Sequence, residues 1–183
     1  GVVCMALLTA GSWAADWPQY RHDAHRSGRT SEALPGSPVR HWRWRAPHAP
    51  RPAWPGHDTR MPFDRAFHPV VAAGTAYVAS SADGTIYALD ARTGRERWHA
   101  CTSAPVRFAP AVAGNRLFAA SDDGFIYCLS TADGRMLWNR RAGPNHELVM
   151  GNGFCVSRWP ARGGPVVLGD SVFFGAGIWP AEG

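Results

Sequence analysis

The sequence contains no lysine, so arginine supplies all 19 of its basic residues, and the formal net charge is +5. It also lacks continuous basic runs and any recognisable nucleic-acid-binding module, so the charge predicts no nucleic-acid partner. No segment has the length and periodicity of a long amphipathic helix. The 20 glycines, 15 prolines and 9 tryptophans favour short strands joined by turns. With 45% hydrophobic residues, the composition is globular.

Motifs for catalysis and metal binding are missing as well. There is no Gly-x-Ser-x-Gly elbow, no phosphate-binding loop and no His-Glu-x-x-His helix, and no catalytic residue is predicted. There is no Cys-x-x-Cys pair, which argues against a structural zinc site. The polar stretch with His22, Asp23 and His25 offers too few ligands to predict a metal site.

Long apolar runs are absent, and the longest one lies at the N-terminus. Residues 2–11, VVCMALLTAG, are too short to span a bilayer. Small residues at Ser12 and Ala14 fit a cleavage site after Ala14, with Ala15 as the alternative. We therefore expect residues 1–14 to be an export signal that lacks its start. The mature chain is expected in the periplasm or outside the cell, with no transmembrane segment.

The mature chain keeps three cysteines, which allow at most one disulfide. Cys101, Cys128 and Cys155 are widely spaced, and the sequence does not fix their pairing. Cys128 falls in the middle of an apolar run and is expected to be a small buried residue.

The most informative feature is a repeat. ALDARTGRERW at residues 88–98 returns as CLSTADGRMLW at residues 128–138, forty positions later. The register holds over 25 residues, with Gly74–Trp98 matching Gly114–Trp138, which is a strong sign of a repeat architecture. The residues that recur are Gly74/Gly114, Asp83/Asp123, Gly84/Gly124, Ile86/Ile126, Tyr87/Tyr127, Leu89/Leu129, Gly94/Gly134 and Trp98/Trp138.

Each repeat predicts four short strands. In the first repeat they are expected at residues 69–72, 76–80, 85–90 and 95–99, with an Asp-Gly hairpin turn at residues 82–84 that supplies positive φ angles. Turn chemistry also accounts for Asp83, Asp122 and Asp123 better than calcium binding does. The third strand is apolar at consecutive positions, which is typical of a sheet covered on both faces.

A four-stranded unit of forty residues predicts an all-β protein, a β-propeller. Residues 68–107 form the first expected blade, and residues 108–162 the second, with an insertion. A third blade starts at residues 163–183. About two and a half blades are therefore present in an incomplete ring, after a lead-in segment at residues 15–67. The Gly-His and Trp-Asp signatures of WD40 repeats are absent.

The repeat resembles the tryptophan-docking motif of the pyrroloquinoline quinone (PQQ) repeat family. The first copy has Ala88, Asp90, Thr93, Gly94 and Trp98 at the motif positions, and the second keeps Gly134 and Trp138. WPQYRHDAHRSGRT at residues 17–30 is similar to the opening segment of secreted PQQ-like repeat proteins of planctomycete-type bacteria. The resemblance implies that each tryptophan packs against a neighbouring blade, and that the motif itself does not contact the quinone.

The insertion in the second blade holds the candidate ligand-binding residues. Between the tryptophan and the next blade's proline, the chain runs from Trp98 to Pro110 in one repeat and from Trp138 to Pro165 in the other. Arg158, Trp159 and Arg162 offer two guanidinium groups and an aromatic face to an anionic ligand. The alternative is a loop pinned onto the propeller by Trp159.

Three functions remain open. The first is a non-catalytic binding or scaffold module, whose partners are other envelope proteins or a small anionic ligand. The second, implied by the family resemblance, is part of a PQQ-dependent quinoprotein dehydrogenase with PQQ and calcium as cofactors. The third is a sugar- or ligand-sensing domain, in which tryptophans that precede proline form a platform. Because no catalytic residue is found, the first is favoured, and no cofactor is assured.

Overall fold

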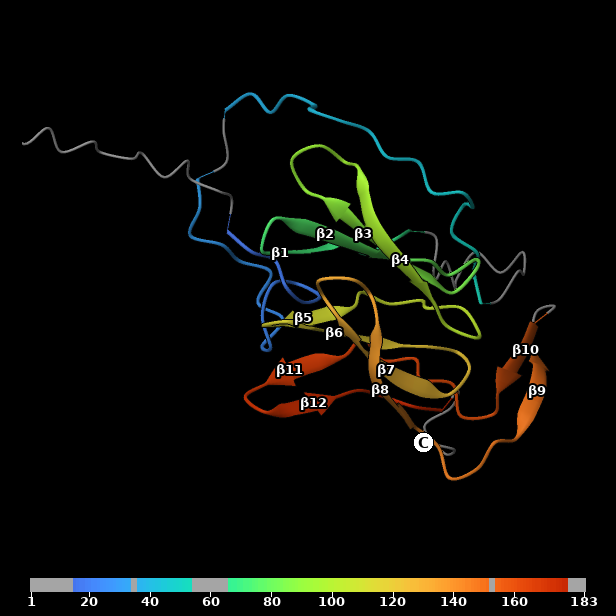
Figure 1. The fold of residues 1–183 in the computed structure, drawn as a ribbon. Coiled ribbons are helices and arrows are strands. Elements are labelled where there is room, and N and C mark those ends of the chain that lie inside the picture. Colours follow the sequence, from blue (N-terminus) through green and yellow to red (C-terminus); the bar gives the residue numbers. More distant parts are fainter. Residues whose placement is uncertain (1–14, 34–35, 54–65, 152–153, 178–183) are drawn as a thin grey trace, which may run out of the picture.

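The computed structural model describes residues 15–33, 36–53, 66–151 and 154–177 (Figure 1). All regular secondary structure in these residues is β-strand, so the expectation of an all-β chain is confirmed. The proposed export signal at residues 1–14 lies outside the described residues. Within the described part of the chain, no helix is both long and apolar enough to cross a membrane.

Two four-stranded antiparallel sheets form the centre of the structure, each with its strands in sequence order. We call them blade 1 and blade 2. Blade 1 consists of β1 (Val70–Ala72), β2 (Thr75–Ala79), β3 (Thr85–Asp90) and β4 (Glu96–Cys101). Blade 2 consists of β5 (Ala111–Ala113), β6 (Arg116–Ala120), β7 (Phe125–Ser130) and β8 (Met136–Arg141). Both follow the strand order predicted from the forty-residue repeat, and β3 has the bounds that the sequence predicted.

The turn between β2 and β3 differs from the expected Asp-Gly hairpin in one respect. Gly84 has a positive φ of 70°, but Asp83 does not. The Asp83 carboxylate instead accepts the Thr85 backbone N–H at 3.0 Å and the Tyr87 hydroxyl at 3.3 Å. The aspartate therefore orders the turn through its side chain, and only the glycine supplies the left-handed backbone conformation.

The two blades stack face to face, and the core lies between them (Figure 1). Tyr77 and Ile86 of blade 1 belong to one buried cluster with Leu117 and Leu129 of blade 2. The opposite face of blade 1 is also covered, because Tyr87 and its buried neighbours pack against the lead-in segment and β1. The apolar run in β3 is explained by this burial on both faces.

Two further hairpins complete the fold. β11 (Val166–Leu168) and β12 (Ser171–Phe173) pair beyond blade 2, in the region where the sequence predicts the start of a third blade. β9 (Leu148–Gly151) and β10 (Phe154–Ser157) pair within the insertion, for which the sequence predicts no strands. Figure 1 shows this second hairpin standing to one side of the stacked blades. The sequence signal for it was the Asn152-Gly153 pair between two short apolar stretches.

Candidate functional site

The three candidate ligand-binding residues lie at the end of the insertion, and each contacts a different partner. Arg158 extends its Nη1 to the Glu147 carboxylate, 3.1 Å from Oε1 and 3.2 Å from Oε2, in a solvent-exposed ion pair. The Trp159 ring lies directly against Gly143, where any β-carbon would collide with it. These two contacts join the start of the insertion to its end.

Arg162 is less exposed than Arg158 and forms an ion pair with Asp122. Its Nε lies 2.9 Å from Asp122 Oδ1, and its Nη2 lies 3.0 Å from Asp122 Oδ2. Arg107 approaches the same carboxylate from the other side, with Nε 2.6 Å from Oδ2. Both carboxylate oxygens therefore accept charge-assisted hydrogen bonds, and Arg162 donates its two bonds in bidentate geometry. We call Asp122, Arg107 and Arg162 the arginine clamp.

The arginine clamp is buried. The side chain of Asp122 is 1% exposed, that of Arg107 is 4% exposed and that of Arg162 is 19% exposed. Such charges are tolerated away from water only when they are paired and hydrogen-bonded. The backbone adds to the order, because the Asp122 N–H donates to the Pro105 carbonyl at 2.9 Å. The carbonyl of Asp122 in turn accepts the Ser157 N–H at 2.8 Å.

Four segments meet at the arginine clamp. Arg107 comes from the link between blades 1 and 2, Asp122 from the turn between β6 and β7, and Arg162 from the link after the insertion. The Nη1 of Arg107 also donates to the carbonyl of Arg51, at 2.9 Å, and so reaches the lead-in segment. The clamp thus joins the lead-in segment, both links and blade 2.

Arg107 is not among the residues predicted from the sequence, although a signal is present. Pro105-x-Arg107-x-x-Pro110 recurs as Pro160-x-Arg162-x-x-Pro165 at a spacing of 55 residues. The insertion shifts this second repeat out of the forty-residue register, so a search at forty does not find it. The anion predicted for Arg162 is, in the structure, an aspartate of the protein itself. Ligand binding by Arg158, Trp159 and Arg162 stays a prediction.

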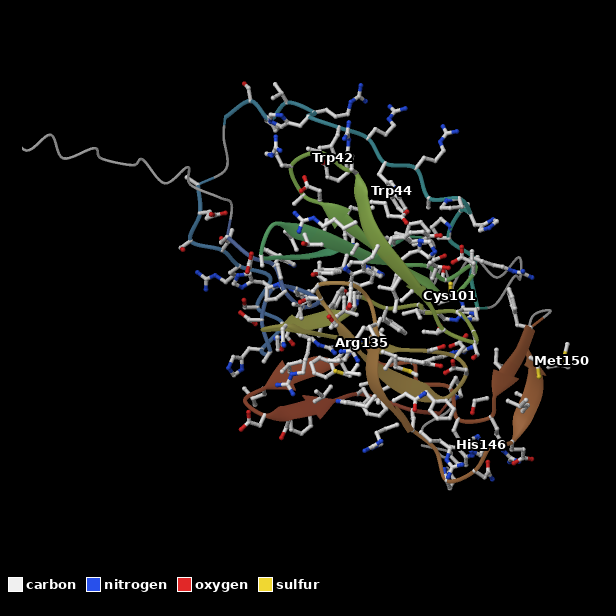
Figure 2. The ribbon with its side chains drawn as sticks, viewed as in Figure 1. Trp42, Trp44, Cys101, Arg135, His146 and Met150 are labelled. Carbon is white, nitrogen blue, oxygen red and sulfur yellow. The ribbon has the colours of Figure 1, made fainter. Side chains whose placement is uncertain are left out.

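The same contact between a tryptophan and a turn glycine occurs twice, once with Trp98 and once with Trp42. The Trp98 indole lies on Gly134, the turn glycine of blade 2, and its Nε1 donates to the Thr131 carbonyl at 2.9 Å. Trp42 of the lead-in segment lies on Gly94 of blade 1, and its Nε1 donates to the Ala91 carbonyl at 3.0 Å. Figure 2 shows Trp42 and Trp44 directed from the lead-in segment toward blade 1.

Trp42 was not among the predicted docking residues. The stretch Arg40-His41-Trp42 has the basic and aromatic character of the β4 sequence around Trp98, but it stands 56 positions earlier. Segment lengths differ there, so no fixed period reveals it.

The turn that receives Trp42 is ordered by Asp90. Its Oδ1 accepts the Thr93 backbone N–H at 2.8 Å and the Thr93 hydroxyl at 2.9 Å, and its Oδ2 lies 2.7 Å from Arg97 Nη2. These bonds, that of Arg97 foremost, hold the pKa of the Asp90 carboxyl well below its usual range. Gly94 follows with a φ of 71°, and because glycine has no β-carbon the indole can lie directly on it. Ala88, the first residue of the motif, is buried opposite Trp98 in the β3–β4 pair.

The described residues lack a cluster of metal-binding side chains. No group of three or more His, Cys, Asp or Glu side chains among them could hold a metal ion. Calcium takes six to eight oxygen ligands, whereas the oxygens of Asp122 are already held by guanidinium groups. The described cysteines are free thiols, and Cys128 is buried in β7 as expected.

The fold and these contacts define a β-propeller of the PQQ-like repeat class. A family model described as outer membrane protein assembly factor BamB matches residues 40–177 of the chain. The chain belongs to this family. No curated protein matches the sequence.

The solved structures of two quinohemoprotein alcohol dehydrogenases show the same fold. The quinohemoprotein alcohol dehydrogenase of Comamonas testosteroni is similar with a TM-score of 0.57 and 18% identity, over 88% of this chain and 23% of that one. The quinohemoprotein alcohol dehydrogenase ADHIIG of Pseudomonas putida HK5 gives 0.50 and 23%, over 60% and 16%. BamB of Moraxella catarrhalis gives 0.38 and 18%, over 56% and 40%. The chain thus spans less than half the length of each.

Proposed function

We propose that the chain is part of a non-catalytic propeller of the cell envelope, which binds another envelope protein through the β9–β10 hairpin. The proposal places the protein in the periplasm or outside the cell. The observation that carries it is a rigidly anchored hairpin that exposes apolar side chains.

The hairpin has one outward face. Leu148 and Met150 are 59% and 77% exposed, and Cys155, the cross-strand partner of Met150, is exposed as well. Figure 2 shows Met150 directed away from the blades. Val156, on the other face, is 2% exposed. Covering side chains as apolar as Leu148 and Met150 with a partner lowers the free energy of the system.

The base of the hairpin is held on several sides. The Arg158 N–H donates to the Glu147 carbonyl at 2.8 Å, and the two side chains form an ion pair. The guanidinium of Arg51 lies over the Phe154 ring, 4.3 Å from its centroid. A surface that is ordered before binding loses less entropy when a partner docks.

The kind of partner is suggested by the family. Its description names outer membrane protein assembly, and a scaffold in that process would present fixed surfaces to other envelope proteins. The buried charges also support a scaffold, because the carboxylate of Asp122 forms ion pairs with Arg107 and Arg162 that hold parts of the fold together.

The test is a comparison of envelope partners. The protein and its Leu148→Ser/Met150→Ser variant would be cross-linked in cells and purified, and the cross-linked proteins identified and purified for direct binding measurements. We expect an outer membrane assembly protein to bind the parent chain and to bind the variant at least tenfold more weakly. The control is Val39→Ser, which alters an apolar side chain of the lead-in segment that is 73% exposed. If the Leu148→Ser/Met150→Ser variant bound the partner as tightly as the Val39→Ser control, the hairpin would be rejected as the contact.

The competing function, a quinoprotein dehydrogenase, has its own readout. PQQ would be titrated into the protein in the presence of calcium, with tryptophan fluorescence as the signal. Under the scaffold proposal no saturable quenching is expected, whereas saturable quenching that requires calcium would favour the dehydrogenase.

A further inference from the structure

The N-terminal segment follows the innermost strands of three blades. In Figure 1 it is the blue stretch that lies beside β1 and β5. The Trp17 N–H donates to the Val71 carbonyl at 2.7 Å, and the Val71 N–H donates back to the Trp17 carbonyl at 2.9 Å. The Val112 N–H donates to the Pro18 carbonyl at 2.8 Å.

Gln19 continues the series with its side chain. The Val167 N–H donates to Gln19 Oε1 at 2.7 Å, and Gln19 Nε2 donates to the Val167 carbonyl at 3.3 Å. A primary amide has the same donor and acceptor as a peptide group, so it pairs with a strand edge as another strand would. Gln19 is only 9% exposed, so these bonds are shielded from water.

The three valines occupy equivalent positions. Val71, Val112 and Val167 are the middle residues of β1, β5 and β11, which are the first strands of successive blades. In each blade the first strand pairs with the second on one edge only. The other edge carries backbone groups that need a partner. Residues 17, 18 and 19 supply one partner to each blade in turn.

The chain after Gln19 folds back and is tied down again. Asp23 accepts hydrogen bonds from both the backbone N–H and the hydroxyl of Ser27. Arg26 donates through Nη2 to the Gly164 carbonyl at 3.1 Å, next to the start of β11. Arg21, His22 and Arg26 all have positive φ, a conformation that is costly for residues with a side chain. The hydrogen bonds to the three blades offset that cost.

We propose that residues 16–28 form an axial strap, which pairs with the inward edges of β1, β5 and β11, sets the spacing of three successive blades and closes those edges to any other ligand. The inner strands of adjacent blades contact one another, β1 with β5 and β5 with β11, so their free edges face the central axis of the ring. A ligand that approaches these strands along the axis must first displace Trp17, Pro18 and Gln19.

Amide hydrogen exchange measured by NMR tests the strap in the folded protein. Gln19→Met removes both side-chain hydrogen bonds and keeps the side-chain length. We expect the Val167 amide to exchange about tenfold faster, and the Val71 and Val112 amides to exchange faster too, because the strap lifts as one unit. Amides of β3 and β7 should not change.

The matched control is Asn115→Met, the same change of an amide side chain at an exposed turn of blade 2. It should leave all three valine amides unchanged. No change at Val167 in Gln19→Met would overturn the strap. A change at Val167 without one at Val71 and Val112 would reduce it to a single side-chain contact. Faster exchange of equal size in β3 and β7 would also overturn it, because Gln19 would then stabilise the domain as a whole.

Discussion

The indole of Trp98 lies so close to Gly134 of the next blade that a β-carbon on Gly134 would come within 2.5 Å of Trp98 Cε3. Trp42 and Gly94 stand in the same relation, at 2.6 Å. The tryptophan and the glycine of one motif copy therefore serve different contacts. The glycine receives a ring from the preceding segment, and the tryptophan reaches forward. These two contacts explain why the glycine and the tryptophan recur together in the motif.

A first prediction separates steric fit from backbone strain. Gly134→Ala places a methyl group against the Trp98 ring in a left-handed conformation, and we expect it to lower the free energy of unfolding by about 2–5 kcal/mol. Gly114→Ala is the control, because Gly114 also has a positive φ, 57°, but nothing lies within 4 Å of its β-carbon. It should cost about 1–2 kcal/mol in denaturant melting. Equal losses would show that ring contact adds nothing.

A second prediction concerns the tryptophan. Trp98→Ala removes a buried ring and its hydrogen bond to Thr131, and should lower the free energy of unfolding by about 3–5 kcal/mol. Trp98→Phe keeps most of the ring and should cost less. Denaturant melting of both variants measures the difference. A loss below about 1 kcal/mol for Trp98→Ala would reject docking between blades.

A third prediction addresses the arginine clamp. Asp122→Asn keeps the shape of the side chain but leaves two guanidinium groups without their shared negative charge. We expect a loss of about 3–5 kcal/mol in thermal or denaturant unfolding. Asp170→Asn, which makes the same change at an exposed turn, should be nearly neutral. If both substitutions had similar small effects, the clamp would not hold the links together.

A fourth prediction concerns pH. The hydrogen bonds from Ser27 lower the pKa of Asp23 to about 2, with the hydroxyl as the largest cause. Their stabilising effect is thus present above the usual carboxyl pKa near 4 and is lost as the pH falls through about 2. Ser27→Ala should move the Asp23 midpoint upward in an NMR titration, while the midpoint of Asp133, on another turn, stays in place. An unchanged Asp23 midpoint would contradict this contact.

Much of the blade architecture followed from local sequence signals. The forty-residue register predicted two four-stranded units, because each short strand ends at a glycine or aspartate turn whose chemistry is local. The bounds of β3 were predicted correctly for that reason. Even so, the sequence favoured positive φ at both residues of the Asp83-Gly84 turn. In the structure only Gly84 has a positive φ, and Asp83 instead orders the turn through its side chain.

The contacts between distant segments were not predictable in this way. Arg107 and Arg162 were separate residues in the sequence, and nothing local showed that both would reach Asp122. Trp42 lay outside the repeat register, and the pairing of Gln19 with Val167 joins residues 148 positions apart.

By itself, the sequence determined that this protein is built from four-stranded units, since turns and strand periodicity depend on neighbouring residues. Only the tertiary structure decided which partner each buried charge and strand edge would have. A desolvated carboxylate or an unpaired backbone N–H is costly wherever it lies, but the group that satisfies it depends on how the blades stack in three dimensions.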